Sequence, residues 1–334
     1  MKHLIRILLP GLMLTLISSQ TLAATLKIAT IAPAGTTWMN EMKQGAKAIK
    51  TKTEGRVKLK FYPGGVMGND QSVHRKIKIG QLHGGAFTSG GLSHAFPGIQ
   101  ALSLPMLFTS FDEVDYVRAR VDEQLKRNIE ASGFVLLGLS EGGFARILSK
   151  TPLTDLESIR QSKVWIPEGD ELVNDAFKTL GISPVSLPYS DVFTGLQTGL
   201  IETVTVNPTA AIAFQWHTNM AYMTETPLTY IIGTLAVQKK AFDKLKAEDQ
   251  KIVRDEVAQV FKRLDVINRA DNESAAQALR NQGIEFISPS EEERKRWKAL
   301  ANKSIEGMIQ SGRVSKAMYD EVNRHLSDFH SSQQ

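Results

Sequence analysis

Short apolar stretches alternate with segments of helical periodicity along the first part of the chain. Residues 26–30 (LKIAT), 57–62 (VKLKFY) and 84–87 (GGAF) have strand character, whereas apolar positions recur at helical spacing in residues 38–51 and 69–79. A strand–helix–strand–helix order is typical of a parallel sheet with helices on its faces.

A second α/β unit follows the first, and a helical segment ends the chain. The pattern predicts strands at residues 134–139, 164–166, 185–187, 202–206 and 228–237, and helices at 175–180 and 189–200. Residues 241–282 have the pattern of one almost uninterrupted helix, and residues 291–328 are mostly helical. We therefore expect two α/β lobes with a long helical C-terminal part packed across them.

The N-terminus has the three parts of a secretory signal peptide. Lys2 and Arg6 are basic, residues 7–17 are mostly apolar, and small residues lead to Ala23 and Ala24. The apolar run is shorter than the roughly 20 residues of a membrane span. No Cys is present to carry a lipid anchor. We expect residues 1–23 to be cleaved off and the mature protein to be exported to the periplasm.

The composition removes several classes of function. Without Lys2 and Arg6, 38 basic residues stand against 35 acidic ones, and the two signs are interspersed. This mild balance predicts no nucleic-acid partner. Because the chain has no Cys, it lacks disulfides and cysteine chemistry, and its stability must come from the core that 334 residues can supply. The seven His follow no HExxH pattern, and no phosphate-binding glycine motif follows a strand, so we expect neither a metal nor a cofactor.

One catalytic motif is present. Residues 138–142 (GLSEG) match GxSxG, with Ser140 as the candidate nucleophile and with Asp191 and His217 in hydrolase order. In hydrolases with this motif, the serine is exposed on a sharp turn between a strand and a helix. Here two glycines and a strand-like segment follow the serine instead of a helix. An esterase is therefore kept as an alternative, and we expect a protein that is not an enzyme.

Several short motifs occur in a fixed order along the chain. They are LKIATIAP at 26–33, YPGGVMGND at 62–70, VHRKIKIGQLHGGAF at 73–87, LP at 104–105, KVWIP at 163–167, SPVSLPYSDVFTGLQTGL at 183–200, NP at 207–208 and KKAFDKL at 239–245. In this order and spacing, the mature chain resembles the DctP-type solute-binding proteins of TRAP (tripartite ATP-independent periplasmic) transporters.

This resemblance implies an α/β fold of two domains, with a ligand cleft between them and a long helix that spans both. On this basis we expect residues 24–145 with about 232–275 to form domain I, and residues 146–231 with about 276–334 to form domain II. The resemblance also implies that the protein delivers a small solute to a TRAP permease. Ser140 is then a loop residue where the chain crosses between domains.

The motif at 163–167 departs from the family at one position. Members of the family typically carry an Arg before the hydrophobic-Pro pair, where it binds the substrate carboxylate bidentately. This chain has Trp165 there. The family's second Arg aligns with Ala145, and Arg146 lies one residue further, on the opposite face of a strand. The chain thus resembles the family in its overall fold but lacks both arginines at the positions where the family binds the substrate carboxylate.

We expect a neutral or amphipathic, largely apolar ligand, because a buried anion without a partner costs several kcal/mol. An indole offers a flat apolar face and one N–H donor. Two alternatives stay open, a carboxylate ligand held by Arg146 and a Trp165 that only fills the core. The residues that the resemblance and the apolar surroundings place at the ligand are Trp165, Tyr189, Asn207, Phe87, Thr88, Trp38, Phe144 and Arg146. A further alternative is a binding protein that serves a sensor or a periplasmic helical-repeat partner rather than a permease alone.

Overall fold

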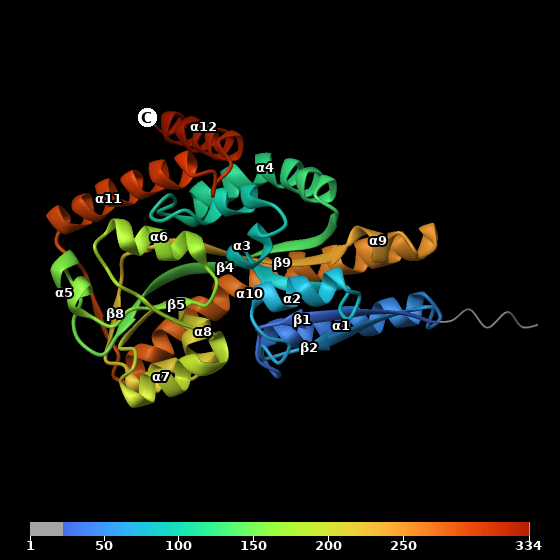
Figure 1. The fold of residues 1–334 in the computed structure, drawn as a ribbon, viewed down its shortest axis with the longest axis horizontal. Coiled ribbons are helices and arrows are strands. Elements are labelled where there is room, and N and C mark those ends of the chain that lie inside the picture. Colours follow the sequence, from blue (N-terminus) through green and yellow to red (C-terminus); the bar gives the residue numbers. More distant parts are fainter. Residues whose placement is uncertain (1–22, 334) are drawn as a thin grey trace, which may run out of the picture.

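A computed structural model describes residues 23–333, so the expected signal peptide lies almost entirely outside the described residues (Figure 1). The strands are β1 (Ala24–Thr30), β2 (Val57–Tyr62), β3 (Gly84–Thr88), β4 (Phe134–Ser149), β5 (Trp165–Pro167), β6 (Val185–Leu187), β7 (Thr203–Val206), β8 (Tyr222–Thr224), β9 (Thr229–Gln238) and β10 (Glu285–Ile287). The α-helices are α1 (Thr37–Lys52), α2 (Asp70–Lys78), α3 (Ser89–Ser93), α4 (Phe111–Ala131), α5 (Leu156–Gln161), α6 (Glu171–Thr179), α7 (Val192–Thr198), α8 (Pro208–Ala213), α9 (Lys239–Phe242), α10 (Ala247–Asn281), α11 (Glu291–Gln310) and α12 (Lys316–Ser332). Three 3₁₀ helices complete the fold, η1 (Pro97–Ser103), η2 (Tyr189–Asp191) and η3 (Trp216–Asn219).

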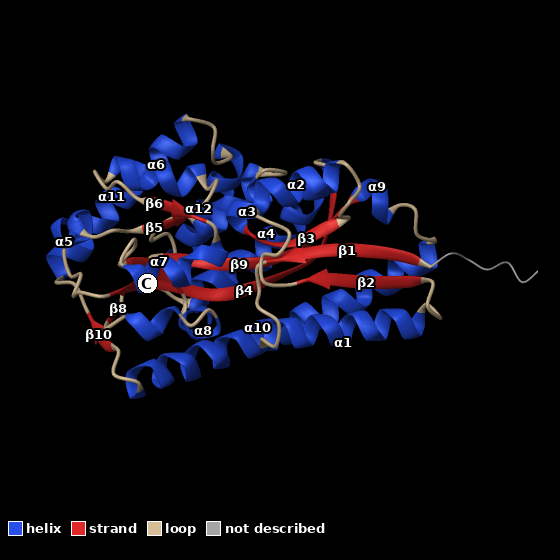
Figure 2. Ribbon diagram, turned by 60° about the horizontal axis from the view of Figure 1, so that its bottom comes forward, coloured by secondary structure: helices blue, strands red, loops and turns tan. Residues whose placement is uncertain are grey.

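One sheet runs through the whole molecule. Its order is β10-β8-β4-β9-β3-β1-β2, with β7 paired to β4, and β5 and β6 form a separate pair. The first three strands are parallel to one another, whereas β9 is antiparallel to both β3 and β4. The long strands β4 and β9 lie along the middle of the sheet and extend through both lobes (Figure 2). The first lobe, as we use the term, contains β1 to β3 with α1 to α4, and the second contains β5 to β8, β10 and α5 to α8.

The 35-residue helix α10 also crosses from one lobe to the other, over a length of about 50 Å (Figures 1 and 2). Val253, Val257 and Leu264 recur on one face and are buried in the core beneath β1 and β9. Near the other end, Leu279 is buried in the core of the second lobe. This pattern confirms the expected domain-spanning helix. The chain breaks before it, however, because residues 243–246 separate α9 from α10 where one helix was expected.

The expectation that Ser140 lies in a loop is wrong. Residues 134–149 form one continuous strand, β4, and Ser140 sits in its middle opposite Gly233 of β9. The two glycines after it do not end the strand. They are absorbed by an irregularity in the pairing between Glu141 and Gly143, and Gly143 adopts a φ of +84° that only glycine takes readily.

Of the two C-terminal helices, α11 packs against α6 of the second lobe, and α12 packs against α4 and η1. Helix α4 begins with a capping box in which Ser110 and Glu113 bond each other's backbone N–H groups. Among residues 23–333, no helix is both long enough and apolar enough to cross a membrane.

Candidate functional site

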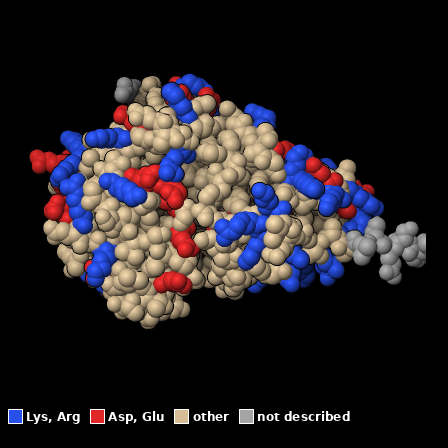
Figure 3. Space-filling view, viewed as in Figure 1, with Lys and Arg blue, Asp and Glu red and all other residues tan. Residues whose placement is uncertain are grey.

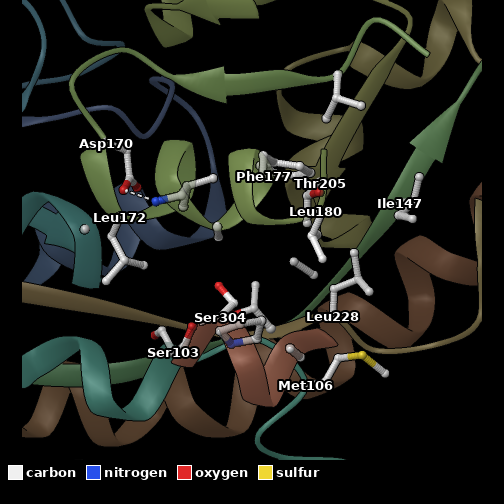
Figure 4. Close-up of a pocket in the computed structure, with 18 of the residues that line it drawn as sticks. Ser103, Met106, Ile147, Asp170, Leu172, Phe177, Leu180, Thr205, Leu228 and Ser304 are labelled. Atoms are coloured by element: carbon white, nitrogen blue, oxygen red, sulfur yellow. Dashed lines mark hydrogen bonds between the residues drawn. The ribbon is translucent and has the colours of Figure 1, made fainter. Parts of the chain in front are cut away.

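A cavity of about 290 Å³ lies between the two lobes, beneath α6 (Figure 4). The first lobe contributes the end of β3, the start of α3 and part of η1, and the second contributes β5, β7, α5, α6 and η2. The long strands β4 and β9 and the helix α11 complete the wall. The cavity therefore has the position that the resemblance predicts for the ligand cleft.

The wall of this cavity is mostly apolar. Asp170 is its single charged side chain, and none of the described residues that line it is Lys, Arg or His. Several of its hydroxyl groups are engaged within the protein. The Thr229 hydroxyl donates to the Ser103 carbonyl at 2.7 Å, and the Thr203 hydroxyl lies 2.5 Å from that of Ser162. The described wall of the cavity thus offers mainly apolar surface and one carboxylate.

Helix α6 covers the cavity with an apolar face whose side chains are only partly buried and pack at the edges of the neighbouring cores. Leu172, Val173, Ala176, Phe177 and the cap residue Leu180 all line the cavity. None of the residues of α6 is fully buried, although its apolar positions follow helical spacing. Figure 4 shows three of these side chains across the cavity from the residues of η1 and α11. An amphipathic helix normally buries such a face, so the face is completed by whatever fills the cavity.

Ion pairs with Arg313 lie on the outer side of α6. Arg313 Nε lies 2.7 Å from Asp175 Oδ2, and its Nη2 lies 3.8 Å from Glu171 Oε2. Figure 3 shows acidic side chains gathered over α6 with basic ones beside them. These pairs are partly exposed, so each contributes at most about 1 kcal/mol. These ion pairs therefore add only weakly to the packing of α6 against α11 and the neighbouring cores.

Trp165 lines the cavity and is also a core residue. It is 3% exposed, and its rings meet those of Tyr189 and Trp216 edge-on, each at a centroid distance of 5.1 Å. Its Nε1 donates to the Leu187 carbonyl of the neighbouring strand at 2.9 Å. The indole N–H is therefore already satisfied, and only the apolar part of the ring is available to a ligand.

Tyr189 and Thr88 line the same cavity. Tyr189 packs against Trp216 and Phe214, and burial, with Asp70 and Asp170 nearby, raises the pKa of its phenol. The Thr88 hydroxyl caps α3 by accepting the Gly91 N–H. Of the sequence-predicted residues, the structure thus brings Trp165, Tyr189 and Thr88 together at the cavity.

Arg146 does not line the cavity. Its neighbours Ala145 and Ile147 do, so the alternation of β4 turns the Arg146 side chain to the other face. There its guanidinium donates to the Glu225 carbonyl, and burial lowers its pKa. No contact in the described residues turns it toward the ligand space.

Four other predicted residues also lie off the cavity wall. Asn207 caps α8 by accepting the Ala210 N–H at 2.7 Å, and its Nδ2 donates to the Gly142 carbonyl. Phe87 stacks on His74 at 5.0 Å, and Phe144 packs against Phe111 and Tyr230. Trp38 packs on the core beneath β1.

The esterase alternative does not fit the structure. Ser140 is 1% exposed inside β4, so no substrate carbonyl can reach its hydroxyl. His217 Nδ1 lies 3.0 Å from the Ala211 carbonyl, and Asp191 accepts from Ser190, so neither is directed at the serine. Within the described residues, no group of three or more metal-ligating side chains is found either.

Two carboxylates that the sequence did not single out face each other across the lobes. Asp70 begins α2 in the first lobe, and Asp170 caps α6 by accepting the Val173 N–H at 3.1 Å. Both crowd the glycines of α3, because a Cβ on Gly90 would lie 2.8 Å from Asp170 and one on Gly91 would lie 2.7 Å from Asp70. Burial, followed by repulsion from Asp170, raises the pKa of Asp70 to about 6, and burial raises the pKa of Asp170 as well.

Comparison with known proteins places this chain in a family. The family model of the bacterial extracellular solute-binding proteins, family 7, called DctP, matches residues 28–311. Uncharacterized protein YiiZ of Salmonella typhimurium is 27% identical over 209 residues, which are 61% of this chain and 63% of YiiZ. The sialic acid-binding periplasmic protein SiaP of Vibrio cholerae is 26% identical over 208 residues, 60% of this chain and 63% of SiaP. These matches span less than two thirds of either relative.

Solved structures agree on the fold. A TRAP periplasmic solute binding protein from Xanthobacter autotrophicus, with bound β-D-galacturonate, superposes with a TM-score of 0.82 at 20% identity and covers 90% of this chain and 99% of its own. This likeness confirms the expected α/β periplasmic binding protein fold. With the family match over residues 28–311, it shows that the chain belongs to the DctP family, family 7 of the bacterial extracellular solute-binding proteins.

Proposed function

We propose that this protein is the periplasmic solute-binding component of a TRAP-type transporter and that its ligand is a neutral, largely apolar molecule. The ligand enters between the lobes, lies against Trp165, Tyr189 and Thr88, and is delivered to permease subunits in the inner membrane. Membership of the DctP family supports the transport role.

One observation carries the choice of ligand. Among the described residues, the cavity wall contains Asp170 but no cationic side chain, and the apolar face of α6 is turned toward the cavity. A carboxylate in this cavity would lose its hydration without gaining a cation, at a cost of several kcal/mol. An apolar molecule instead gains about 25 cal/mol for each Å² that it buries against α6.

The ligands named for similar proteins instead favour a carboxylate. SiaP is named for sialic acid, and the Xanthobacter protein holds galacturonate, and both ligands are carboxylic acids. Binding an acid here would need a cation from elsewhere, since Arg146 bonds the Glu225 carbonyl on the far side of β4. A periplasmic helical-repeat protein as an additional partner, and cleavage of residues 1–23 on export, are proposals that rest on the sequence alone.

Native mass spectrometry of the mature protein, purified without refolding, tests the proposal. The retained molecule is released by denaturation and identified. We expect a neutral compound with an apolar body, and a simple organic acid would overturn the choice of ligand. For an empty protein, thermal unfolding is measured with N-phenyl-1-naphthylamine as a neutral apolar probe and with galacturonate as the acid. At about 100 times its dissociation constant, a ligand adds about 2.7 kcal/mol of stability.

A matched pair of variants ties the binding to α6. Phe177 lines the cavity without being buried, whereas Leu196 is fully buried in the core of the second lobe. Phe177→Ala should weaken binding of the naphthylamine probe several-fold. Because Phe177 is only partly buried, the change should cost the ligand-free protein less than the roughly 3–5 kcal/mol of a fully buried Phe. Leu196→Ala should cost about 2–5 kcal/mol of stability and leave the affinity of the folded protein unchanged. Equal probe affinity of Phe177→Ala and wild type would contradict the assignment of α6 to the site.

A further inference from the structure

Two carboxylates lie at the end of the cavity where α6 begins. Asp170 is the one charged side chain among the described residues of the cavity wall, and Figure 4 shows it at the start of α6. Asp70 approaches from the first lobe. A Cβ on Gly91 would lie 2.7 Å from the Asp70 carboxylate, and one on Gly90 would lie 2.8 Å from Asp170 Oδ2. The two carboxylates therefore contact adjacent residues of α3.

Both carboxylates are ionised at neutral pH. Asp170 is the N-cap of α6, where it accepts the Val173 N–H at 3.1 Å and also bonds the Leu172 N–H. Burial raises the pKa of Asp170, whereas these bonds and the nearby His94 lower it. Burial, followed by the charge of Asp170, raises the pKa of Asp70 to about 6. Asp170 therefore loses its proton before Asp70 does, and both are charged at pH 7.5.

The described wall of the cavity supplies no cation to balance these charges, since it contains no Lys, Arg or His. Arg313 pairs with α6, but it does so on the outer side of the helix, with Asp175. On the inner side, the phenol of Tyr189 lines the cavity. Burial, followed by the charges of Asp70 and Asp170, raises its pKa. The charges that oppose a phenolate here also oppose any other anion in the cavity.

Repulsion of this kind decides specificity in a way that a missing partner does not. A binding site rejects a wrong ligand either by lacking contacts for it or by placing a like charge against it. Charge repulsion acts over several ångströms without contact, and it is stronger beside an apolar wall than in water. An acid in this cavity therefore meets a repulsive charge in addition to lacking a cation. A neutral molecule with the same apolar body meets neither obstacle.

We propose that Asp170 and Asp70 are specificity-determining residues that exclude anionic ligands from the cavity by charge repulsion. This inference rests on the proposed function, because it concerns the ligand of the same site. It adds the residues that make the choice and the rule by which they make it. On the same apolar chain, an anionic head group is rejected, whereas a neutral or a cationic head group is tolerated.

Competition binding tests the inference with three compounds that share an eight-carbon chain and differ in a fixed charge. N-phenyl-1-naphthylamine fluorescence at pH 7.5 reports occupancy of the mature protein, and 1-octanol, 1-octanesulfonate and octyltrimethylammonium are the competitors. With wild type, we expect octyltrimethylammonium to compete about as well as 1-octanol, and 1-octanesulfonate about tenfold or more weakly. In the double variant Asp70→Asn, Asp170→Asn, the affinity for 1-octanesulfonate relative to octyltrimethylammonium should rise about tenfold, while that for 1-octanol should change less than about twofold.

A matched variant separates the effect of charge from a structural effect. Asn caps a helix about as well as Asp, so Asp170→Asn keeps the cap of α6, and circular dichroism checks that the double variant is folded. Asp175→Asn is the control, because Asp175 lies on the same helix but on its outer side, where Arg313 Nε is 2.7 Å from its Oδ2. This control should leave the affinities for all three competitors within about twofold of wild type.

The failures of the two proposals are distinguishable. If the wild type binds neither the naphthylamine probe nor 1-octanol, the apolar cavity is wrong and both proposals fall. If it binds both, but the double variant ranks the three competitors with the same affinity ratios as wild type, only the role of Asp70 and Asp170 is overturned. If 1-octanesulfonate competes better than 1-octanol with the wild type, the neutral ligand and the exclusion of anions are both wrong. Octyltrimethylammonium competing far better than 1-octanol would support the charge discrimination and overturn the neutral ligand.

Discussion

Replacing Asp70 by Asn should stabilise the ligand-free protein at neutral pH. Asp70 is partly buried at the start of α2, with Asp170 facing it from the second lobe. The Asn69 side chain beside it donates to Glu168, and the nearby His94 lowers the pKa of Asp170 without cancelling the effect of burial. A helix N-terminus favours a carboxylate by up to about 1 kcal/mol, but burial and repulsion outweigh this and raise the pKa of Asp70 to about 6.

The raised pKa of Asp70 determines how the free energy of unfolding changes with pH. Between pH 6 and pH 4 the folded protein holds a proton on Asp70 that the unfolded chain, with a pKa of 3.8, releases. The free energy of unfolding therefore rises as the pH falls from 7 toward 4, and the cost of the ionised form is largest above pH 6. The difference between 3.8 and about 6 corresponds to about 3 kcal/mol. Asp70→Asn should gain this amount at pH 7.5, equivalent to about 5 °C in melting temperature.

Thermal or urea unfolding of wild type and Asp70→Asn between pH 4 and pH 8 measures the effect, and the two should converge near pH 4. Asp170→Asn tests the origin of the repulsion, because Asn also caps a helix well and should shift the pH dependence of Asp70 toward acid. Asp112→Asn is the control, since Asp112 is exposed in the first turn of α4 and its replacement should cost under about 1 kcal/mol. An Asp70→Asn variant that is less stable than wild type at pH 7.5, or a difference that does not change with pH, would refute the reasoning.

Three further substitutions probe the contacts around the site. Gly91→Ala places a Cβ 2.7 Å from the Asp70 carboxylate, so it should destabilise the protein by about 1–3 kcal/mol in urea unfolding, and Gly307→Ala, with open space around it, is the control. Arg269→Met leaves the 1%-exposed Glu141 without its partner at 2.6 Å and should cost about 3 kcal/mol, visible in the melting temperature. Trp165→Arg, which restores the family's residue, should cost at least as much and give no affinity for galacturonate in calorimetry, because the ring's space is enclosed by Tyr189 and Trp216.

Periodicity predicted most of the fold because alternation and helical spacing are local. The same rule placed Arg146 on the opposite face from Ala145, and the structure has it there. The continuity of β4 was not predictable from residues 134–149 alone. Its glycines fit either a turn or an irregular strand, and only pairing with β9, far along the chain, decides between them.

The site was only partly accessible from sequence. Trp165 and Tyr189 lie in a motif, so the resemblance pointed to them, and the structure places both at the cavity. The cavity wall combines η1 with α11, about 200 residues apart, so the meeting of these residues follows from the fold and not from a local pattern. The raised pKa of Asp70 likewise depends on its burial in the folded protein and on a second carboxylate 100 residues away, and neither is visible in the local sequence.

The way the lobes are joined has a consequence for how the molecule unfolds. Strands β4 and β9 and helix α10 pass through both lobes without interruption, and β4 and β9 are hydrogen-bonded to each other along most of their shared length. Neither lobe can lose its part of the sheet without breaking strands that belong to the other. The two lobes therefore behave as one cooperative unit, and calorimetric melting of the ligand-free protein gives a single transition rather than two.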